Sequence, residues 1–212
     1  CINLEEIKLS ENVRRIGEMT FYNCNSLKQI KLPLKLKSLG SRVFGGTGIT
    51  SITIPKTLES AYSYNKGALA GARNLKEVII EDGMTKIPPD LVCVDEDNQI
   101  QKVQIPSSVK EIGGSAFRNC VCLTEMSFGK GLEKIGSSAF YGCKGLKKIN
   151  FTDNADANCE LTIENSAFAG CINLEEVKLS ENIKGIGAGA FYNCNSLKQI
   201  KLPLKLKTLG SG

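Results

Sequence analysis

The strongest constraint on the fold is that the chain repeats itself. Residues 1–41 and 171–211 are identical at 33 of 41 positions, at an offset of 170 residues and without a gap. Each copy begins with Cys-Ile-Asn-Leu-Glu-Glu, at Cys1 and again at Cys171. Unrelated segments do not reach this agreement by chance, so the chain contains duplicated material and must be read as a repeat protein first.

A shorter repeat lies inside the long one. Residues 100–122 and 123–145 share the template Leu-x-x-Ile-x-Ile-Pro-x-x-Val-x-x-Ile-Gly-x-x-Ala-Phe-x-x-Cys-x-x, with similar residues at each apolar position. Units follow one another every 22 to 28 residues, so the offset of 170 residues corresponds to seven units. We call the nine units coils 1 to 9, and they begin at Leu4, Leu27, Ile49, Leu75, Ile100, Leu123, Leu146, Leu174 and Leu197.

The spacing of the template predicts local structure. Leu-x-x-Ile-x-Ile ends in the alternation of a half-buried strand, and a following proline, which cannot donate to a strand ladder, ends that strand. Val-x-x-Ile-Gly predicts a second short extended segment. Ala-Phe-x-x-Cys predicts a single helical turn, because residues three apart share a helix face. One unit buries little alone, so stability requires stacking into continuous apolar columns.

The template resembles the BspA-type leucine-rich repeat, found in surface proteins of bacteria and some parasitic protists. The resemblance rests on the leucine-rich 23-residue units with Ile-Gly-x-x-Ala-Phe-x-x-Cys and covers essentially the whole chain. It implies a right-handed solenoid at a cell surface or in a secreted protein, adhesion to host or microbial proteins, and no catalytic residue. We therefore expect a β-rich α/β solenoid with a parallel sheet on one face and residues 1–212 as one domain.

Neither end of the chain reads as a capping repeat. It starts at the cysteine position of one unit and stops just after the second extended segment of another. Solenoids need terminal repeats with a polar outer side, so we expect a fragment of a longer array. Because residues 1–41 and 171–211 are near-identical, we also expect the C-terminal coil of one chain to accept the N-terminal coil of another, end to end.

Composition excludes several classes of function. The chain has no histidine, which removes histidine-based nucleophile activation and histidine-ligated zinc. The 27 basic residues are nearly all lysines distributed along the chain and aromatic residues are 6%, which argues against nucleic-acid binding. No run approaches a membrane span, and no secretion signal opens the sequence. The surface localisation is therefore an expectation from the resemblance.

Two template positions predict interior columns. The cysteine position is occupied by Cys1, Cys24, Cys120, Cys143, Cys171 and Cys194, and the phenylalanine position by Phe21, Phe44, Phe117, Phe140, Phe168 and Phe191. Neighbouring coils lie about 4.8 Å apart, within reach of a disulfide, but stacked side chains point in parallel, which is poor disulfide geometry. Since Ala72 fills the same position in one unit, we expect buried thiols that act as small apolar residues.

Other motifs give no site. The glycine-rich Gly185–Ala190 stretch becomes Arg-Ile-Gly-Glu-Met-Thr in its duplicate, and no long helix follows, so it is not a dinucleotide loop. The acidic stretch from Asp95 would need glycine and glutamate where Ile100 and Pro106 stand, so it is not an EF-hand. We therefore expect no cofactor and no metal.

The outward positions of the main strands form the candidate binding surface. Adhesion to an extracellular protein is the expected function, and a carbohydrate or cell-wall module is the alternative, disfavoured by the absence of tryptophan. Regularity breaks in the middle third of the chain, where we expect an exposed isoleucine and tyrosines on an insertion to act as anchors. The candidate residues are Lys8, Lys31, Thr53, Glu77, Ile79, Lys102, Gln104, Tyr62 and Tyr64.

Overall fold

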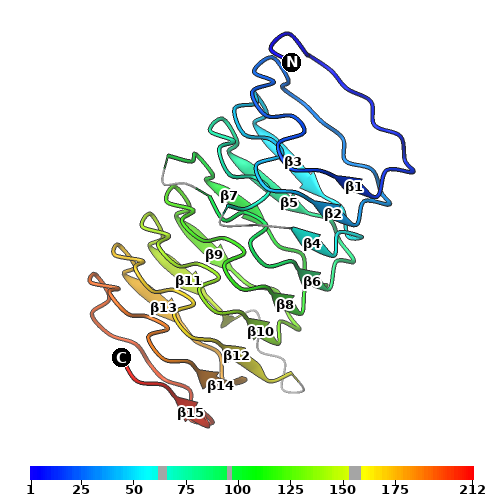
Figure 1. Ribbon diagram of the computed structural model, residues 1–212. Helices are drawn as coiled ribbons and strands as arrows, with labels where there is room; N and C mark the ends of the chain where they lie inside the picture. The colour runs from blue at the N-terminus through cyan, green and yellow to red at the C-terminus, as the bar shows by residue number, and fades with distance from the viewer. Residues whose placement is uncertain (62–65, 95–96, 153–158) are drawn as a thin grey trace.

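The computed structural model describes residues 1–61, 66–94, 97–152 and 159–212. The chain winds into coils stacked along one axis, with the two termini at opposite ends of the stack (Figure 1). Nine short strands on one side of the described chain mark nine coils, and the ninth coil stops just after its strand, which leaves about eight complete turns. Within the described ranges no helix is long and apolar enough to cross a membrane.

The main layer consists of parallel strands, one for each of coils 3 to 8, in two three-stranded sheets. They alternate between buried and solvent-facing residues, as Ser51–Ile54 does with Ile52 and Ile54 inward. This alternation is the one that the template predicts, and the parallel-sheet solenoid is confirmed. The strands are β3 (Ser51–Ile54), β5 (Glu77–Ile80), β7 (Lys102–Gln104), β9 (Glu125–Ser127), β11 (Lys148–Asn150) and β13 (Glu176–Lys178).

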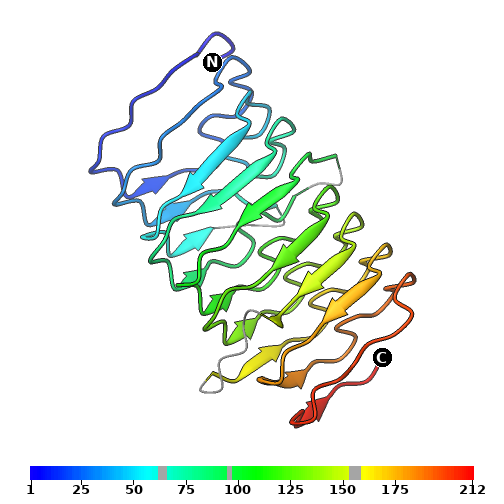
Figure 2. The same cartoon turned by 180° about the vertical axis from the view of Figure 1, so that it is seen from behind.

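The second layer lies on the opposite side of each coil, and Figures 1 and 2 show the two layers from opposite sides. Its strands pair in parallel in the order β1-β2-β4 and β6-β8-β10-β12-β14-β15. They are β1 (Arg15–Ile16), β2 (Ser38–Leu39), β4 (Ser60–Ala61), β6 (Lys86–Ile87), β8 (Glu111–Ile112), β10 (Lys134–Ile135), β12 (Leu161–Ile163), β14 (Ile183–Ile186) and β15 (Thr208–Leu209).

The Ala-Phe-x-x-Cys segment is a run of turns, so the expected single helical turn is wrong. The described residues contain no α-helix. Alternate N–H groups of the segment donate to the next coil, as Phe117 does to the Ala139 carbonyl (2.8 Å) and Asn119 to the Tyr141 carbonyl (2.8 Å). An α-helix would use those donors internally. The segment therefore forms a third ladder between coils.

Residues in the left-handed backbone conformation make this third ladder possible. The residue before the cysteine position has a positive φ in seven coils, and in all seven it is asparagine or glycine: Asn23, Gly46, Gly71, Asn119, Gly142, Gly170 and Asn193. Glycine adopts this conformation without a Cβ clash, and asparagine tolerates it better than most residues. The pattern is readable in the sequence and explains why the segment does not close into a helix.

Stacked rings and thiols fill the interior beside these turns. The rings of Phe140 and Phe168 are 5.2 Å apart between centroids, and those of Phe168 and Phe191 are 5.5 Å apart. The thiol of Cys143 is fully buried and donates to the carbonyl of Phe117 in the preceding coil (3.2 Å). Burial and the neighbouring Cys120 thiol raise the pKa of Cys143 well above its ordinary value.

The same arrangement extends along most of the column. Cys171 donates to the Phe140 carbonyl at 3.4 Å and Cys194 to the Phe168 carbonyl at 3.3 Å. Cys24 and Cys120 are also buried, whereas Cys194 is half-buried and Cys1 is exposed. All nine cysteines lie within the described residues and all are free thiols there. These columns are therefore interior packing and lie away from the outer face of the main layer.

The left-handed turn position gives a stability prediction. Asn193 has φ of 58° and an exposed side chain. We expect Asn193→Gly to leave the free energy of unfolding nearly unchanged, and Asn193→Ala to lower it by about 1 kcal/mol, because alanine is strained in this conformation. Denaturant unfolding measures both. Asn195→Ala, an exposed change outside this position, is the control, and an equal loss in Asn193→Ala and Asn195→Ala would contradict the assignment.

Candidate binding surface

The outer face of the main layer gathers five of the candidate residues. The strand register places Thr53, Ile79 and Gln104 opposite one another in one row. The neighbouring row contains Glu77 and Lys102, which are also direct partners. These five residues therefore form one continuous surface over β3, β5 and β7.

The remaining candidates lie elsewhere. Lys8 and Lys31 belong to coils 1 and 2 and line a separate groove of about 910 Å³. In the described part of the chain, no strand pairing joins that segment of coil 2 to β3. Tyr62 and Tyr64 lie outside the described residues, so their role as anchors stays a prediction.

A small polar cluster organises the centre of this surface. The Glu77 carboxylate accepts from the Lys102 ammonium at 2.8 Å and from the Gln104 amide at 2.6 Å. The hydrogen bond from Lys102, followed by that from Gln104, lowers the pKa of Glu77. Because the cluster is open to solvent, it orients these three side chains but adds little stability.

Beside this cluster the main layer is not continuous. β5 pairs with β7 and β9 pairs with β11, but among the described residues no pairing joins β7 to β9. We call such a pair of neighbouring coils, unpaired in the main layer, an open boundary. The second layer stays closed at the same place, because β8 pairs directly with β10.

A groove of about 660 Å³ follows the open boundary between β7 and β9. We call it the central groove. Its apolar lining residues are Ile79, Ile80, Val103, Ile105, Pro106, Met126 and Ile149. Its polar lining residues are Asp82, Gln104, Glu125, Ser127, Lys148, Asn150, Glu176 and Lys178.

The opening partly exposes interior positions of the template. Val103 and Ile105 occupy inward positions but are only half-buried. Val78, the register partner of Val103, and Ile80, at the template position of Ile105 in the preceding coil, are 0% and 3% exposed. The central groove therefore reaches down to the apolar columns of the core.

The exposure of Ile79 differs from the prediction. The sequence predicts an exposed side chain, but the structure places it half-buried, between its register neighbours Thr53 and Gln104. It remains part of the lining of the central groove. Val103 and Ile105 were missed at the sequence level, because template positions mark them as interior and nothing in one coil signals a missing hydrogen bond to the next.

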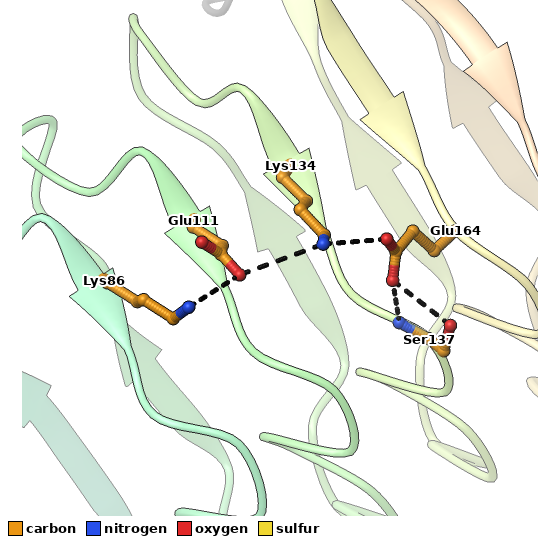
Figure 3. Close-up of polar contacts among 5 residues, drawn as sticks. All are labelled: Lys86, Glu111, Lys134, Ser137 and Glu164. Carbon is orange, nitrogen blue, oxygen red and sulfur yellow. Dashed lines mark hydrogen bonds and ion pairs between the residues drawn. The ribbon is translucent and has the colours of Figure 1, made fainter. Parts of the chain in front are cut away.

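The outer face of the second layer is occupied by ion pairs between coils. Lys86, Glu111, Lys134 and Glu164 form one row across β6, β8, β10 and the residue after β12 (Figure 3). Lys86 lies 3.1 Å from Glu111, and Lys134 lies 2.8 Å from Glu164 and 4.0 Å from Glu111. Glu164 also accepts the Ser137 N–H at 2.9 Å. The charges in this row pair with one another, so the outer face of the second layer is a poorer binding candidate than that of the main layer.

The described residues show no arrangement suited to catalysis by a metal. No group of three or more cysteine, aspartate or glutamate side chains in the described ranges could hold a metal ion. The large grooves are open channels along strands, lined by apolar, amide, hydroxyl, lysine and carboxylate side chains. Such a surface can bind an extended partner, and it offers contacts over several coils at once.

Stacked parallel strands, leucine-rich columns and repeated turns define a leucine-rich-repeat solenoid. The BspA type leucine rich repeat region matches in six copies over residues 1–93 and 92–212. The chain therefore belongs to the BspA-type leucine-rich-repeat family, as its template suggests. No curated protein matches the sequence.

The chain is similar to solved structures of bacterial leucine-rich-repeat proteins. A leucine rich cell surface protein from Faecalibacterium prausnitzii is 25% identical with a TM-score of 0.50, over 95% of this chain and 61% of that chain. A leucine-rich repeat protein from Bacteroides ovatus is 25% identical with a TM-score of 0.46, over 99% of this chain and 70% of that chain. The fold is thus shared with a bacterial cell surface protein.

The ion-pair row gives a pH prediction. Partial burial opposes ionisation of Glu164, but the Lys134 ammonium and the Ser137 N–H outweigh it and lower the pKa of this carboxyl group. A carboxyl group whose pKa is lower in the folded than in the unfolded state stabilises the fold when it is ionised. That contribution is complete above the ordinary carboxyl pKa and is lost as the pH falls through the folded-state pKa. The stability advantage of the native chain over Glu164→Gln should therefore shrink between about pH 7 and pH 3.

Thermal unfolding at a series of pH values measures this difference. Glu125→Gln is the control, because Glu125 is exposed and forms no ion pair among the described residues. A difference between the native chain and Glu164→Gln that stays constant over the whole pH range would contradict the assignment.

Proposed function

We propose that this chain is a non-catalytic interaction module of a cell-surface or secreted protein and that it adheres to an extracellular protein. The central groove is its docking site. Family membership and the likeness to a bacterial cell surface protein support the localisation. The docking site is inferred from Val103 and Ile105, which are half-buried and make the core accessible from the outer face.

Apolar side chains at the floor of a groove are what a protein partner needs as an anchor point. Binding energy at protein interfaces is concentrated in a few well-packed apolar or aromatic side chains that fill pockets on the partner. The floor of the central groove contains Ile79, Val103, Ile105 and Met126 from three neighbouring coils. A projecting apolar side chain of the partner would lose its water there without unfolding any coil.

Charged side chains at the edge of the groove complete the site. Glu125 and Lys148 are exposed, and neither has an ion pair among the described residues. They lie in the same row as the Glu77–Lys102 pair, so positive and negative charges alternate from β5 to β11. Charges of this kind select orientation and speed of association more than affinity. The partner should therefore carry both signs of charge around an apolar anchor.

Substitution of Ile79 tests the docking site. Ile79→Glu puts a charge at the floor of the central groove, and we expect binding to an extracellular protein ligand to weaken at least tenfold, since one buried anchor is worth about 2 kcal/mol or more. Thr53→Glu is the matched control, because Thr53 is the register partner of Ile79 but lies outside the central groove. It should leave protein binding nearly unchanged.

The ligand is sought on an array of extracellular-matrix and microbial surface proteins, with a glycan array beside it. Affinities of the native chain and both variants are then measured for the protein that binds, and circular dichroism checks that each variant is folded. Binding to glycans without any protein ligand would overturn the proposal. Equal losses in Ile79→Glu and Thr53→Glu would remove the central groove as the site.

A further inference from the structure

Acidic residues are distributed very unevenly along the chain. Residues 19–58 contain six basic residues and no acidic residue, whereas residues 59–181 contain 13 basic and 18 acidic residues. The lysines are spread along the sequence, but their counterions are not. Coil 2 and the strand of coil 3 therefore form a block of positive charge in which, among the described residues, only Lys37 has an ion pair, with Glu59.

Several lysines in the middle coils are neutralised by neighbours. Lys86, Lys102, Lys110 and Lys134 each lie within 4.0 Å of a glutamate in an adjacent coil. Coil 2 has one such pair, between Lys37 and Glu59 of coil 3 (2.5 Å), but two of its lysines on the main-layer side have none. Lys28 and Lys31 are exposed and form no ion pair in the described part of the chain.

These lysines stand at an open boundary. No pairing joins the main-layer segment of coil 2 to β3 within the described residues, and a groove of about 550 Å³ lies there. We call it the basic groove. None of its lining residues is acidic, and they are Lys28, Gln29, Ile30, Gly48, Thr50, Ser51, Ile52 and Thr53.

The groove on the other side of coil 2 is different. It lies toward coil 1, and its lining includes the carboxylates of Glu5, Glu6 and Glu11. An anion is therefore expected on the coil 3 side, where Lys28 is accompanied by hydroxyl and amide groups. Lys31 lies in the same exposed column as Thr53 and adds a second positive charge beside that groove.

The duplication gives the chain a second copy of this basic sequence. Residues 27–33 and 197–203 are identical, so Lys198 and Lys201 repeat Lys28 and Lys31 seven coils further along. Residues 182–212 contain five basic residues and again no acidic one. At about 4.8 Å per coil, the two basic sequences lie about 34 Å apart on the same side of the stack. A long anionic chain lying parallel to the stack axis could contact both.

We propose that the basic groove binds an anionic polysaccharide, one bearing sulfate or carboxylate groups. Lysines supply point charges for the anions, while Gln29, Thr50 and Ser51 can hydrogen-bond to sugar hydroxyl groups. The lining contains no aromatic residue for stacking bases, which disfavours nucleic acid. The groove is distinct from the central groove, so this binding activity is separate from the proposed protein adhesion.

The test uses immobilised heparin as the probe and compares two double variants. Lys28→Gln with Lys31→Gln removes the lysine that lines the basic groove and the second positive charge beside it. Lys76→Gln with Lys147→Gln removes two exposed charges from the template position of Lys28 in coils 4 and 7, where acidic residues are abundant and which lie outside the central groove. We expect the first variant to bind heparin about tenfold more weakly at low salt, with a shallower salt dependence, and the second to lose less than about twofold.

Several outcomes would overturn the proposal. These are no heparin binding by the native chain at low salt, an equal loss in both double variants, and native binding to desulfated, carboxyl-reduced heparin as tight as to heparin itself. A 20-residue oligoglutamate or single-stranded DNA bound more tightly than heparin would also overturn it, because the site would then serve an acidic protein or a nucleic acid. Circular dichroism confirms that both variants are folded. Protein binding tested with Ile79→Glu is read separately, so either proposal can fail alone.

Discussion

The fold depends on one constraint, the alignment of backbone N–H and C=O groups between neighbouring coils about 4.8 Å apart. Three ladders serve it: the main layer, the second layer and the run of turns at the phenylalanine and cysteine positions. The two strand layers are interrupted at different places. Among the described residues, no pairing joins β4 to β6 in the second layer, where β3 and β5 pair, and none joins β7 to β9 in the main layer, where β8 and β10 pair.

This stagger lets a surface open without loss of the stack. In the described part of the chain, large grooves on the main-layer side follow the open boundaries between coils 1 and 2, coils 2 and 3, and coils 5 and 6. The one between coils 5 and 6 exposes apolar interior positions and suits a protein anchor. The one between coils 2 and 3 exposes lysine, amide and hydroxyl groups and suits an anion. One repeated unit thus presents chemically different sites along a single face.

Much of the fold follows from the sequence because it is periodic. The alternation in Leu-x-x-Ile-x-Ile predicts both the strands and their outward rows, and the register of Thr53, Ile79 and Gln104 follows from counting. The prediction of a helical turn was wrong because the Phe-x-x-Cys spacing also fits consecutive turns. The asparagine or glycine before each cysteine position, as at Asn119, was the decisive signal.

The candidate sites were predicted less well, for a physical reason. Whether a strand pairs with its neighbour depends on two coils together, and the template describes one coil at a time. Val103 and Ile105 therefore look like ordinary core positions in the sequence, although the structure exposes them partly. The absence of acidic residues over residues 19–58 was readable directly, but an even spread of lysines hides it unless acids and bases are counted together.

Amide hydrogen exchange at the open boundary tests the account most directly. At closed boundaries, the amides of Lys102 and Glu176 donate to the preceding coil at 3.1 Å. The equivalent residue, Glu125, makes no such bond to coil 5 in the described part of the chain. We predict that the Glu125 amide exchanges at least tenfold faster than those of Lys102 and Glu176, while Lys134 in the closed second layer stays protected. Equal protection of Glu125, Lys102 and Glu176 would show that the main layer is continuous. It would contradict the claim that the central groove follows an unpaired boundary between β7 and β9.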